Sequence, residues 1–270
     1  MCTGFAAFFN KPIYGFNFDY HEEVDLKFAI ETSNDISAFT FSFSTGGFFV
    51  KNTWMNSSGM FSCFNMLPDD NSEVIQQGPE IIPGMVFSNS LINTGTTVQD
   101  ALRILGGKRY AILRKPKGHQ MLADKYGEAI IVEEGVNCNE VIHMLDNFLV
   151  ITNFKNSDFK EIHYKNVYGF GADRYITAID NIIQYRDNFY IDEAFETLKK
   201  TSSWKDNFKT LASMVFNPTD FTIYIVLTRN FDSIWKVSLE KGTIQSQILQ
   251  STILKIDNGG ITSTNMLNYV

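Results

Sequence analysis

Apolar and polar residues alternate along several short segments of the chain, which is the pattern of a strand with one buried face. These segments are 38–44, 110–113, 120–123, 129–133 and 221–227. Three clusters of turn residues predict hairpin tips, at Asn10-Lys11-Pro12, Asp124-Lys125-Tyr126-Gly127 and Asn217-Pro218-Thr219-Asp220. Because links this short cannot carry a crossover, they favour antiparallel pairing of the strands on either side.

Helical periodicity is less frequent but well defined. Residues 98–105 predict a helix with Thr96 and Gln99 at capping-box spacing and Gly106-Gly107 at its end. Residues 192–200 predict another. A helix over 172–185 follows from the apolar residues that share one face, which are Tyr175, Ile176, Ala178, Ile179, Ile182 and Ile183. Together the segments predict an α+β chain with long antiparallel stretches flanked by helices.

Composition narrows the class of protein. The chain has 270 residues, 44% of them hydrophobic, and neither a repeat nor a linker-like shift in composition, so we expect a single domain over 1–270. Its formal charge of −7, without any cluster of Lys and Arg, makes nucleic acid an unlikely partner class. Three cysteines, at 2, 63 and 138, do not suggest a disulfide scaffold.

The first twenty residues lack the pattern of a secretory signal, and the longest apolar runs are too short to cross a bilayer. A cytoplasmic location is the default expectation. Cys138, His143 and His163 lack the spacing of a zinc site, because no second close pair of ligands accompanies them. We therefore expect no metal ion and no organic cofactor.

The residue directly behind the initiator methionine is Cys2. If Met1 is removed, one residue carries both a thiol and a free α-amine. A cysteine thiol titrates near about 8.5 and an α-amine near about 7.7 to 8.0, so the amine can take the thiol's proton at neutral pH. This is the logic of N-terminal nucleophiles. On position alone, a small apolar residue that starts a buried strand is the favoured interpretation of Cys2, because any residue can follow Met1.

The surrounding sequence resembles a known family. Met1-Cys2-Thr3, followed by Tyr14-Gly15-Phe16-Asn17-Phe18-Asp19-Tyr20, is similar to the opening of the linear amide C–N hydrolases, the choloylglycine hydrolase and penicillin V acylase group of N-terminal nucleophile hydrolases. Four later segments resemble further landmarks of that family in the same order: GMFSCFNML at 59–67, HQMLADKYGEAIIVE at 119–133, VITN at 150–153 and ADRY at 172–175.

The resemblance implies roles for five residues. Cys2 would be the nucleophile and, through its amine, the general base. Asp19 would hold the amine or the thiol, and Arg174 would place a fixed positive charge beside the thiolate. Asn153, assisted by Asn65, would donate hydrogen bonds to the oxyanion. Each also has a structural reading: Asp19 as a turn carboxylate, Asn153 as a strand terminator and Arg174 as a solvent-facing helix residue.

The resemblance further implies the four-layer αββα sandwich of the N-terminal nucleophile hydrolases, and hydrolysis of a linear amide or transfer of its acyl group through a Cys2 thioester. The partner would be a small-molecule amide. The alternative is a catalytically inactive relative that keeps the fold and binds an acylated small molecule.

Two departures from the family matter. Phe16 occupies a position where the family has an arginine, so one positive charge beside the nucleophile is missing. This favours either an apolar acyl pocket, with Phe16, Phe61 and Phe64 as candidate lining, or the inactive alternative. Secondly, Asn153 and Arg174 are only 21 positions apart, too few for the long insertion that builds the tetramer in bile salt hydrolases. We therefore expect a monomer or a homodimer.

Overall fold

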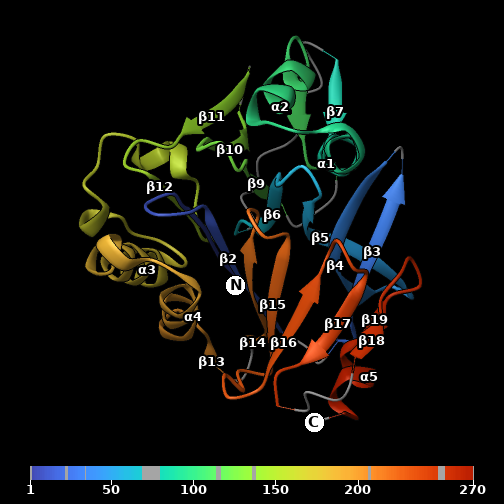
Figure 1. The fold of residues 1–270 in the computed structure, drawn as a ribbon. Coiled ribbons are helices and arrows are strands. Elements are labelled where there is room, and N and C mark those ends of the chain that lie inside the picture. Colours follow the sequence, from blue (N-terminus) through green and yellow to red (C-terminus); the bar gives the residue numbers. More distant parts are fainter. Residues whose placement is uncertain are drawn as a thin grey trace.

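The computed structural model describes residues 2–21, 24–33, 35–68, 80–113, 117–135, 138–205, 208–248 and 253–269. Two large antiparallel sheets dominate it (Figure 1). In the first sheet the strands follow the order β12 (Phe148–Ile151), β1 (Cys2–Ala7), β2 (Ile13–Tyr20), β14 (Phe208–Asn217), β15 (Thr222–Leu227), β16 (Ile234–Ser238), β17 (Thr243–Ser246) and β18 (Ile253–Lys255), with β13 (Trp204–Lys205) also paired to β14.

The second sheet follows the order β11 (Asn139–His143), β10 (Ala129–Glu134), β9 (Gly118–Ala123), β6 (Phe61–Met66), β5 (Phe48–Asn56), β4 (Ile36–Thr45), β3 (Leu26–Ser33) and β19 (Ile261–Thr262). A small separate sheet pairs β7 (Ile81–Pro83) with β8 (Arg109–Ala111) in parallel. The helices are α1 (Gly84–Thr94), α2 (Val98–Leu105), α3 (Ala172–Gln184), α4 (Ile191–Lys200) and α5 (Ser263–Leu267), with 3-10 turns η1 (Asn156–Phe159), η2 (Tyr164–Asn166) and η3 (Arg186–Asn188).

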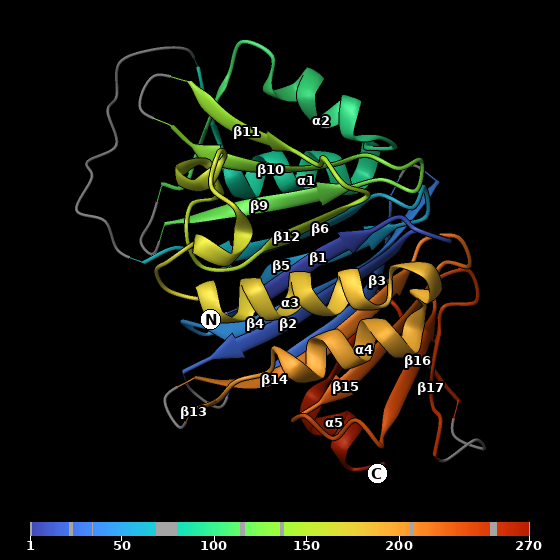
Figure 2. The same ribbon diagram turned by 90° about the vertical axis from the view of Figure 1, so that its left-hand side faces the viewer.

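Three apolar interfaces hold these elements together. The largest contains inward-facing residues of both sheets, including Phe16 and Phe18 from β2 and Phe41 from β4. A second joins α3 and α4 to the first sheet, which Figure 2 shows lying behind these two helices. A third joins α1 and α2 to the second sheet. Burying one face of every helix and both faces of most central strands removes much apolar surface from water, which is the main driving force for folding.

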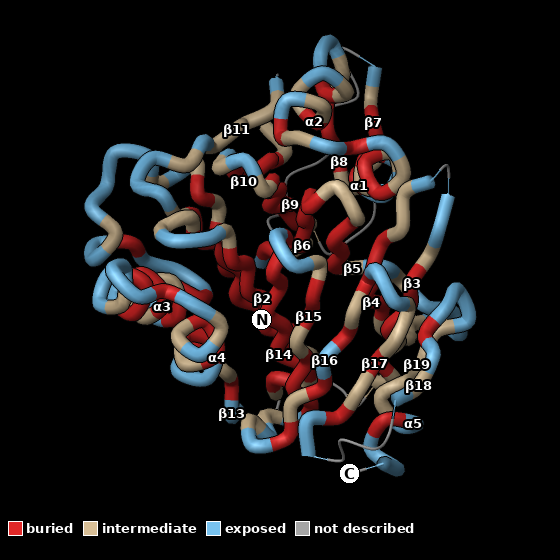
Figure 3. Tube along the Cα trace, in the orientation of Figure 1, coloured by how far each residue is buried: buried red, intermediate tan, exposed pale blue. Residues whose placement is uncertain are grey.

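Burial follows this plan, as Figure 3 shows: the central strands are buried and the connecting segments are exposed. Most of the phenylalanines near the N-terminus fill the core, as their density in the sequence predicts. Phe48 and Phe49, at the tip of the β4–β5 hairpin, are exceptions with 59% and 41% of their surface exposed. Among the described helices, none is long and apolar enough to cross a membrane.

The three predicted hairpins are confirmed: the turns at 10–12, 124–127 and 217–220 join β1 to β2, β9 to β10 and β14 to β15. The helices predicted over 172–185 and 192–200 correspond to α3 and α4. The buried face of α3 differs from the predicted apolar face at one position, because Ile183 is exposed.

Two predictions about 96–113 need correction. The helix over 98–105 is present, but its capping box is formed by Thr97 and Asp100, one position after Thr96 and Gln99. The Asp100 carboxylate also accepts from the Thr96 backbone and hydroxyl, so Thr96 still belongs to the cap. The strand predicted over 110–113 corresponds to β8, which ends at Ala111. It pairs in parallel with β7, which lies far earlier in the chain and leaves room for a crossover between the two strands.

Candidate active site

Cys2 begins β1, a central strand of the first sheet with β12 on one side and β2 on the other. Because side chains alternate along a strand, Cys2 faces the second sheet, whereas Thr3 and Phe5 face the helices. The same alternation on β2 turns Phe16 and Phe18 inward and Asn17 and Asp19 toward the helix side. At the start of β1, the Cys2 thiol on one face of the sheet therefore lies close to polar side chains on the other face.

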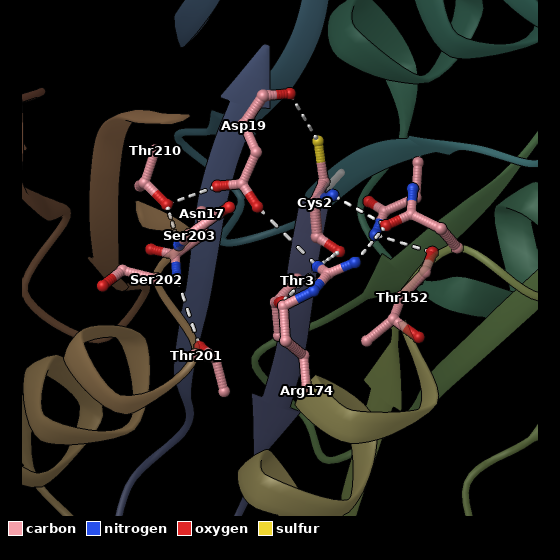
Figure 4. A network of polar contacts seen from close by, with 12 residues as sticks. Cys2, Thr3, Asn17, Asp19, Thr152, Arg174, Thr201, Ser202, Ser203 and Thr210 are labelled. Atoms are coloured by element: carbon pink, nitrogen blue, oxygen red, sulfur yellow. Dashed lines mark hydrogen bonds and ion pairs between the residues drawn. The ribbon is translucent and has the colours of Figure 1, made fainter. Parts of the chain in front are cut away.

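Arg174 lies in the first turn of α3 and reaches the start of β1 (Figure 4). One guanidinium nitrogen, Nη1, donates to the Cys2 carbonyl at 2.6 Å and to Thr3 Oγ1 at 2.9 Å, and Nη2 donates to Asn153 Oδ1 at 2.7 Å. The side chain is buried, so these charge-assisted bonds form with little competition from water. Arg174 is thus an organising residue of the cluster and not the solvent-facing residue of the structural reading.

The approach of Arg174 depends on Gly171, which caps α3 with a φ of 90°. Left-handed backbone of this kind favours glycine. A Cβ added at Gly171 would lie 2.8 Å from Arg174 Nη2 and 3.2 Å from the Asn153 backbone nitrogen. The glycine therefore serves both the turn into the helix and the close contact between α3 and the end of β12.

Asn153 follows β12 and holds the nitrogen of Cys2. Its Oδ1 accepts from Cys2 N at 2.8 Å and from Arg174, and its Nδ2 donates to the Met66 carbonyl at 2.6 Å. Asn65, near the end of β6, donates through Nδ2 to the Thr152 carbonyl at 3.0 Å. The carboxamide of Asn153 thus presents its oxygen to Cys2 N, while its function as an oxyanion donor, with Asn65, stays a prediction.

The Asp19 carboxylate is fully buried on the helix side of β2. Thr210 Oγ1 donates to its Oδ1 at 2.5 Å, and Arg174 Nη1 lies 3.8 Å from its Oδ2. Burial raises the pKa of the Asp19 carboxyl to about 6, although the Arg174 charge and the Thr210 hydrogen bond act in the opposite direction. The Asp19 backbone carbonyl accepts from Cys2 Sγ at 3.9 Å.

The Cys2 thiol is 2% exposed. Burial raises its pKa, the charge of Asp19 adds to that rise, and the charge of Arg174 opposes it in part. A thiol in this environment stays protonated at neutral pH and needs a base before it can act as a nucleophile.

The three aromatic residues predicted to line an acyl pocket lie in different surroundings. Phe16 and Phe61 are fully buried in the interface between the sheets, where Phe61 stacks on Tyr14 with ring centroids 4.9 Å apart. Phe64 alternates to the opposite face of β6 from Phe61 and Asn65 and is partly exposed. Their assignment to a substrate pocket stays a prediction, and Phe64 does not share a face with the other two.

Sequence reasoning missed His119, which lies beside this cluster. The His119 ring on β9 contacts Glu133 Oε1 through Nδ1 at 2.8 Å and the Thr152 carbonyl through Nε2 at 2.9 Å. The hairpin turn at 124–127 carries the signal that could have found the pair. It sets Gln120 opposite Val132, so one further step along that register brings His119 and Glu133 together.

A cleft of about 830 Å³ lies elsewhere, between α3 and the segment that runs from β11 to η2. Its walls are mainly aromatic and aliphatic, with Phe148, Phe159 and Ile179 among them, and none of the predicted catalytic residues lines it. Within the described part of the chain, no group of three or more His, Cys, Asp and Glu side chains could hold a metal ion.

No family model matches the sequence, and no curated protein matches it either. Solved structures do match. A variant of the conjugated bile acid hydrolase from Clostridium perfringens in which an arginine is replaced by leucine superimposes with a TM-score of 0.67, at 16% identity over 91% of this chain and 96% of that chain.

Two further structures show the same likeness. Penicillin V acylase from Agrobacterium tumefaciens matches with a TM-score of 0.60 at 14% identity, over 88% of this chain and 91% of that chain. The Caenorhabditis elegans ortholog of N-acylethanolamine-hydrolyzing acid amidase matches with a TM-score of 0.58 at 17% identity, over 80% and 93%. The resemblance predicted from the sequence is therefore confirmed at the level of the fold, which this chain shares with the bile acid hydrolase, the penicillin V acylase and the amidase.

Proposed function

We propose that this chain hydrolyses a linear amide, or transfers its acyl group, with Cys2 as the nucleophile after removal of Met1. The proposal is supported above all by one observation. Cys2 N, which becomes the α-amine once Met1 is gone, is held by Asn153 Oδ1 at 2.8 Å, and Arg174 binds both Asn153 and the Cys2 carbonyl. A base and a thiol of the same residue are thereby fixed relative to each other.

In the proposed reaction the α-amine takes the Cys2 thiol proton, and the sulfur attacks the amide carbonyl. The tetrahedral intermediate then collapses, the C–N bond breaks, and the ammonium group returns its proton to the leaving amine. A thioester stays on Cys2. Water, or another acceptor, attacks this thioester and releases the acyl group together with the regenerated thiol. Asn153 and Asn65 are the proposed oxyanion donors, each worth about 2 to 4 kcal/mol of barrier if so placed.

Arg174 and Asp19 take supporting roles in this scheme. The fixed positive charge of Arg174 favours the thiolate over the thiol and keeps the Asp19 carboxylate in place, 3.8 Å away. Asp19 in turn contributes its backbone carbonyl beside the sulfur. The buried thiol therefore relies on the α-amine to accept its proton, which is why removal of Met1 is part of the proposal.

The four-layer αββα arrangement belongs to the same proposal. It is supported by the three apolar interfaces, one between the sheets and one under each pair of helices. We also propose that 1–270 is one domain, because the interface between the sheets draws on both the first and the last strands of the chain. A cytoplasmic location stays a prediction.

Phe16 supports the rival function, a non-catalytic protein that binds an acylated small molecule. It fills the arginine position with a fully buried ring, so no guanidinium reaches the thiol from β2. The rival and the enzyme differ in one measurable respect, because only the enzyme forms a covalent bond to Cys2.

The test is turnover and adduct formation with one background variant. Cys138 is an exposed thiol, so Cys138→Ser removes non-specific labelling, whereas Cys63 is buried. In this background we expect hydrolysis of p-nitroanilides of some acyl chain length, and intact mass should show a single acyl adduct on residue 2. Adding Cys2→Ala should abolish both signals.

Equal hydrolysis rates with and without Cys2→Ala would remove the enzyme proposal. Saturable binding of the acyl compound without an adduct would support the rival. Protein purified from its native cells should lack Met1, and retention of Met1 would contradict the mechanism.

A further inference from the structure

His119 and Glu133 form a fully buried pair next to the proposed site. Both side chains are fully shielded from solvent, and Nδ1 of the ring lies 2.8 Å from Glu133 Oε1. The carboxylate also accepts from the backbone N–H groups of Asn156 and Ser157, at 2.7 and 3.1 Å, where η1 begins. In the described structure, Glu133 therefore contacts the His119 ring on one side and hydrogen-bond donors at the start of η1 on the other.

The partners of His119 define where its protons are. A backbone carbonyl can only accept, so Nε2, 2.9 Å from the Thr152 carbonyl, carries a hydrogen. On the other side, either Nδ1 donates to a carboxylate or a protonated Glu133 donates to Nδ1. Burial alone would favour the protonated carboxyl, but the hydrogen bonds from His119 and Ser157 lower the Glu133 pKa below its usual value. In either arrangement the ring and the carboxyl group share one proton between Nδ1 and Oε1, and Nε2–H points at the Thr152 carbonyl.

Few other charges act on this pair. Lys160, which follows η1, interacts with the Glu133 charge but is mainly bound to Glu140 at 2.7 Å. The other partners of the ring and the carboxylate described here are the backbone groups of Thr152, Asn156 and Ser157 and the Ser157 hydroxyl, which do not titrate near neutral pH.

The ring acts on the Cys2 site through one peptide group. The Thr152 carbonyl accepts from His119 Nε2 and also from Asn65 Nδ2 at 3.0 Å. Two donors on one carbonyl fix the plane of the peptide that joins Thr152 to Asn153. Asn153 then presents Oδ1 to Cys2 N at 2.8 Å. The two donors on the carbonyl also polarise this peptide group, which strengthens the backbone N–H of Asn153 as a donor.

We infer that His119, oriented by Glu133, is a positioning residue for the Cys2 site that holds Asn153 in place through the Thr152 carbonyl. The inference deepens the proposed function and rests on it for its kinetic part. His119 contacts neither Cys2 nor any reacting atom in this arrangement. It acts by keeping the residue that binds the nucleophile's nitrogen in its productive place.

The protonation state can be tested without activity. The chain has four histidines, so ¹⁵N-histidine labelling gives few ring signals, and the set missing in His119→Leu identifies His119. We expect a slowly exchanging proton on Nε2 of His119, because this nitrogen is buried and donates to the Thr152 carbonyl. An unprotonated Nε2 would overturn the inference.

The coupling to Cys2 is tested with His119→Leu, which keeps a buried side chain but cannot donate to the Thr152 carbonyl. Because a misplacement of about 1 Å can cost on the order of 100-fold in rate, we expect acylation of Cys2 to slow by about 10- to 100-fold with little change in KM. Gln120→Met is the matched control. Gln120 is equally buried on the same strand but bonds Ser62 on the other face, so its loss should leave acylation near the wild-type rate.

Three outcomes decide the result. Equal acylation rates in His119→Leu and wild type would overturn the positioning role. If His119→Leu does not fold, Glu133→Gln replaces it, because it removes the carboxylate that orients the ring, with the same expected loss of rate. If no donor acylates the wild type, the proposed function fails separately, and the inference is then tested by the side-chain amide signals of Asn153, which must shift in the variant.

Discussion

Asp19 is the residue whose protonation is most altered by the fold. Its folded pKa is about 6, above the value of about 3.8 for a free carboxyl, because the side chain is fully buried. The folded state therefore binds a proton more tightly than the unfolded chain. Stability from this group is fully present below about pH 4 and is lost as pH rises through about 6. At neutral pH the Asp19 carboxylate is ionised in contact with Arg174 and Thr210, and its burial then lowers the free energy of unfolding.

We therefore expect the stability of Asp19→Asn, relative to that of the wild type, to increase as pH rises. The difference in unfolding free energy between variant and wild type should increase by up to about 3 kcal/mol between pH 4 and pH 7.5, because one pKa unit corresponds to about 1.36 kcal/mol. Urea unfolding at a series of pH values measures it. Acylation of Cys2 should fall in the same variant, because Arg174 loses its charged neighbour.

Asp100 provides a control of opposite sign. Burial acts to raise its pKa, but the hydrogen bonds from Thr96, Arg103 and Thr97 outweigh it and lower the pKa well below its usual value. Its contribution is present above about pH 4 and is lost on acidification, so Asp100→Asn should be most destabilising at neutral pH. A difference for Asp19→Asn that stays constant with pH would contradict the assignment of a raised pKa.

At the level of elements, the turn into α3 decides whether Arg174 reaches the nucleophile. Gly171→Ala places a Cβ 2.8 Å from Arg174 Nη2 on a backbone with φ of 90°. We expect a loss of at least about 1 kcal/mol in stability from the backbone alone, together with a marked loss of Cys2 acylation as Arg174 is displaced.

Gly127→Ala is the matched control for that experiment. Gly127 has a φ of 105° in the turn between β9 and β10, but an added Cβ would meet nothing within 4 Å. It should cost similar backbone strain without affecting acylation. If both variants acylate Cys2 at the wild-type rate, the close contact at Gly171 does not control the site.

The same elements show what sequence patterns can and cannot predict. Hairpins were predictable because their turn residues act locally, and α3 because its apolar residues repeat at helical spacing. Helix α1 was missed: Pro83 precedes it, no side chain caps it and no acidic residue lies in its first turn. The parallel pairing of β7 with β8 was also missed, because it joins segments more than twenty residues apart through strands of only three residues.

For the site, the sequence supplied Cys2, Asp19, Asn153 and Arg174 as a group, and the fold brings these four together. The orientation of each side chain was not predictable. Asn153 turns its oxygen to Cys2 N because Arg174 and the Met66 carbonyl fix both ends of its amide. His119 was passed over because its partner on the neighbouring strand emerges only when the register set by the turn at 124–127 is followed to Glu133.

At the scale of the whole molecule, the short connection between β12 and α3 bears on assembly. It spans residues 152–171 and contains η1 and η2. We expect light scattering after size exclusion to give the mass of a monomer, 30.7 kDa, or twice that value. A stable tetramer would contradict the inference from the missing insertion. Exposed Tyr168 and Phe170 on this connection, 73% and 47% exposed, make Tyr168→Asp a test of any dimer that forms through it.

Position 16 belongs to the apolar interface between the two sheets, and this limits which side chains it can hold beside the catalytic site. Phe16 pairs with Gly4 on β1 and Met214 on β14, and its ring is fully buried between the sheets. A guanidinium at this position would have to enter an apolar interior, since the ring's neighbours in that cluster are aromatic, aliphatic and thiol side chains. Burying an unpaired charge costs several kcal/mol unless new partners form.

We therefore expect Phe16→Arg, which installs the residue that the related family has here, to destabilise the protein by at least about 3 kcal/mol in urea unfolding. Phe16→Leu should cost only about 1 to 2 kcal/mol, because it removes volume without adding charge. An arginine variant as stable as the wild type, with faster acylation of Cys2, would mean that this position opens onto the catalytic site. A large loss of stability in Phe16→Arg alone would mean that position 16 requires an apolar side chain for packing between the sheets. Arg174 would then be the cation that acts on the nucleophile among the residues described here.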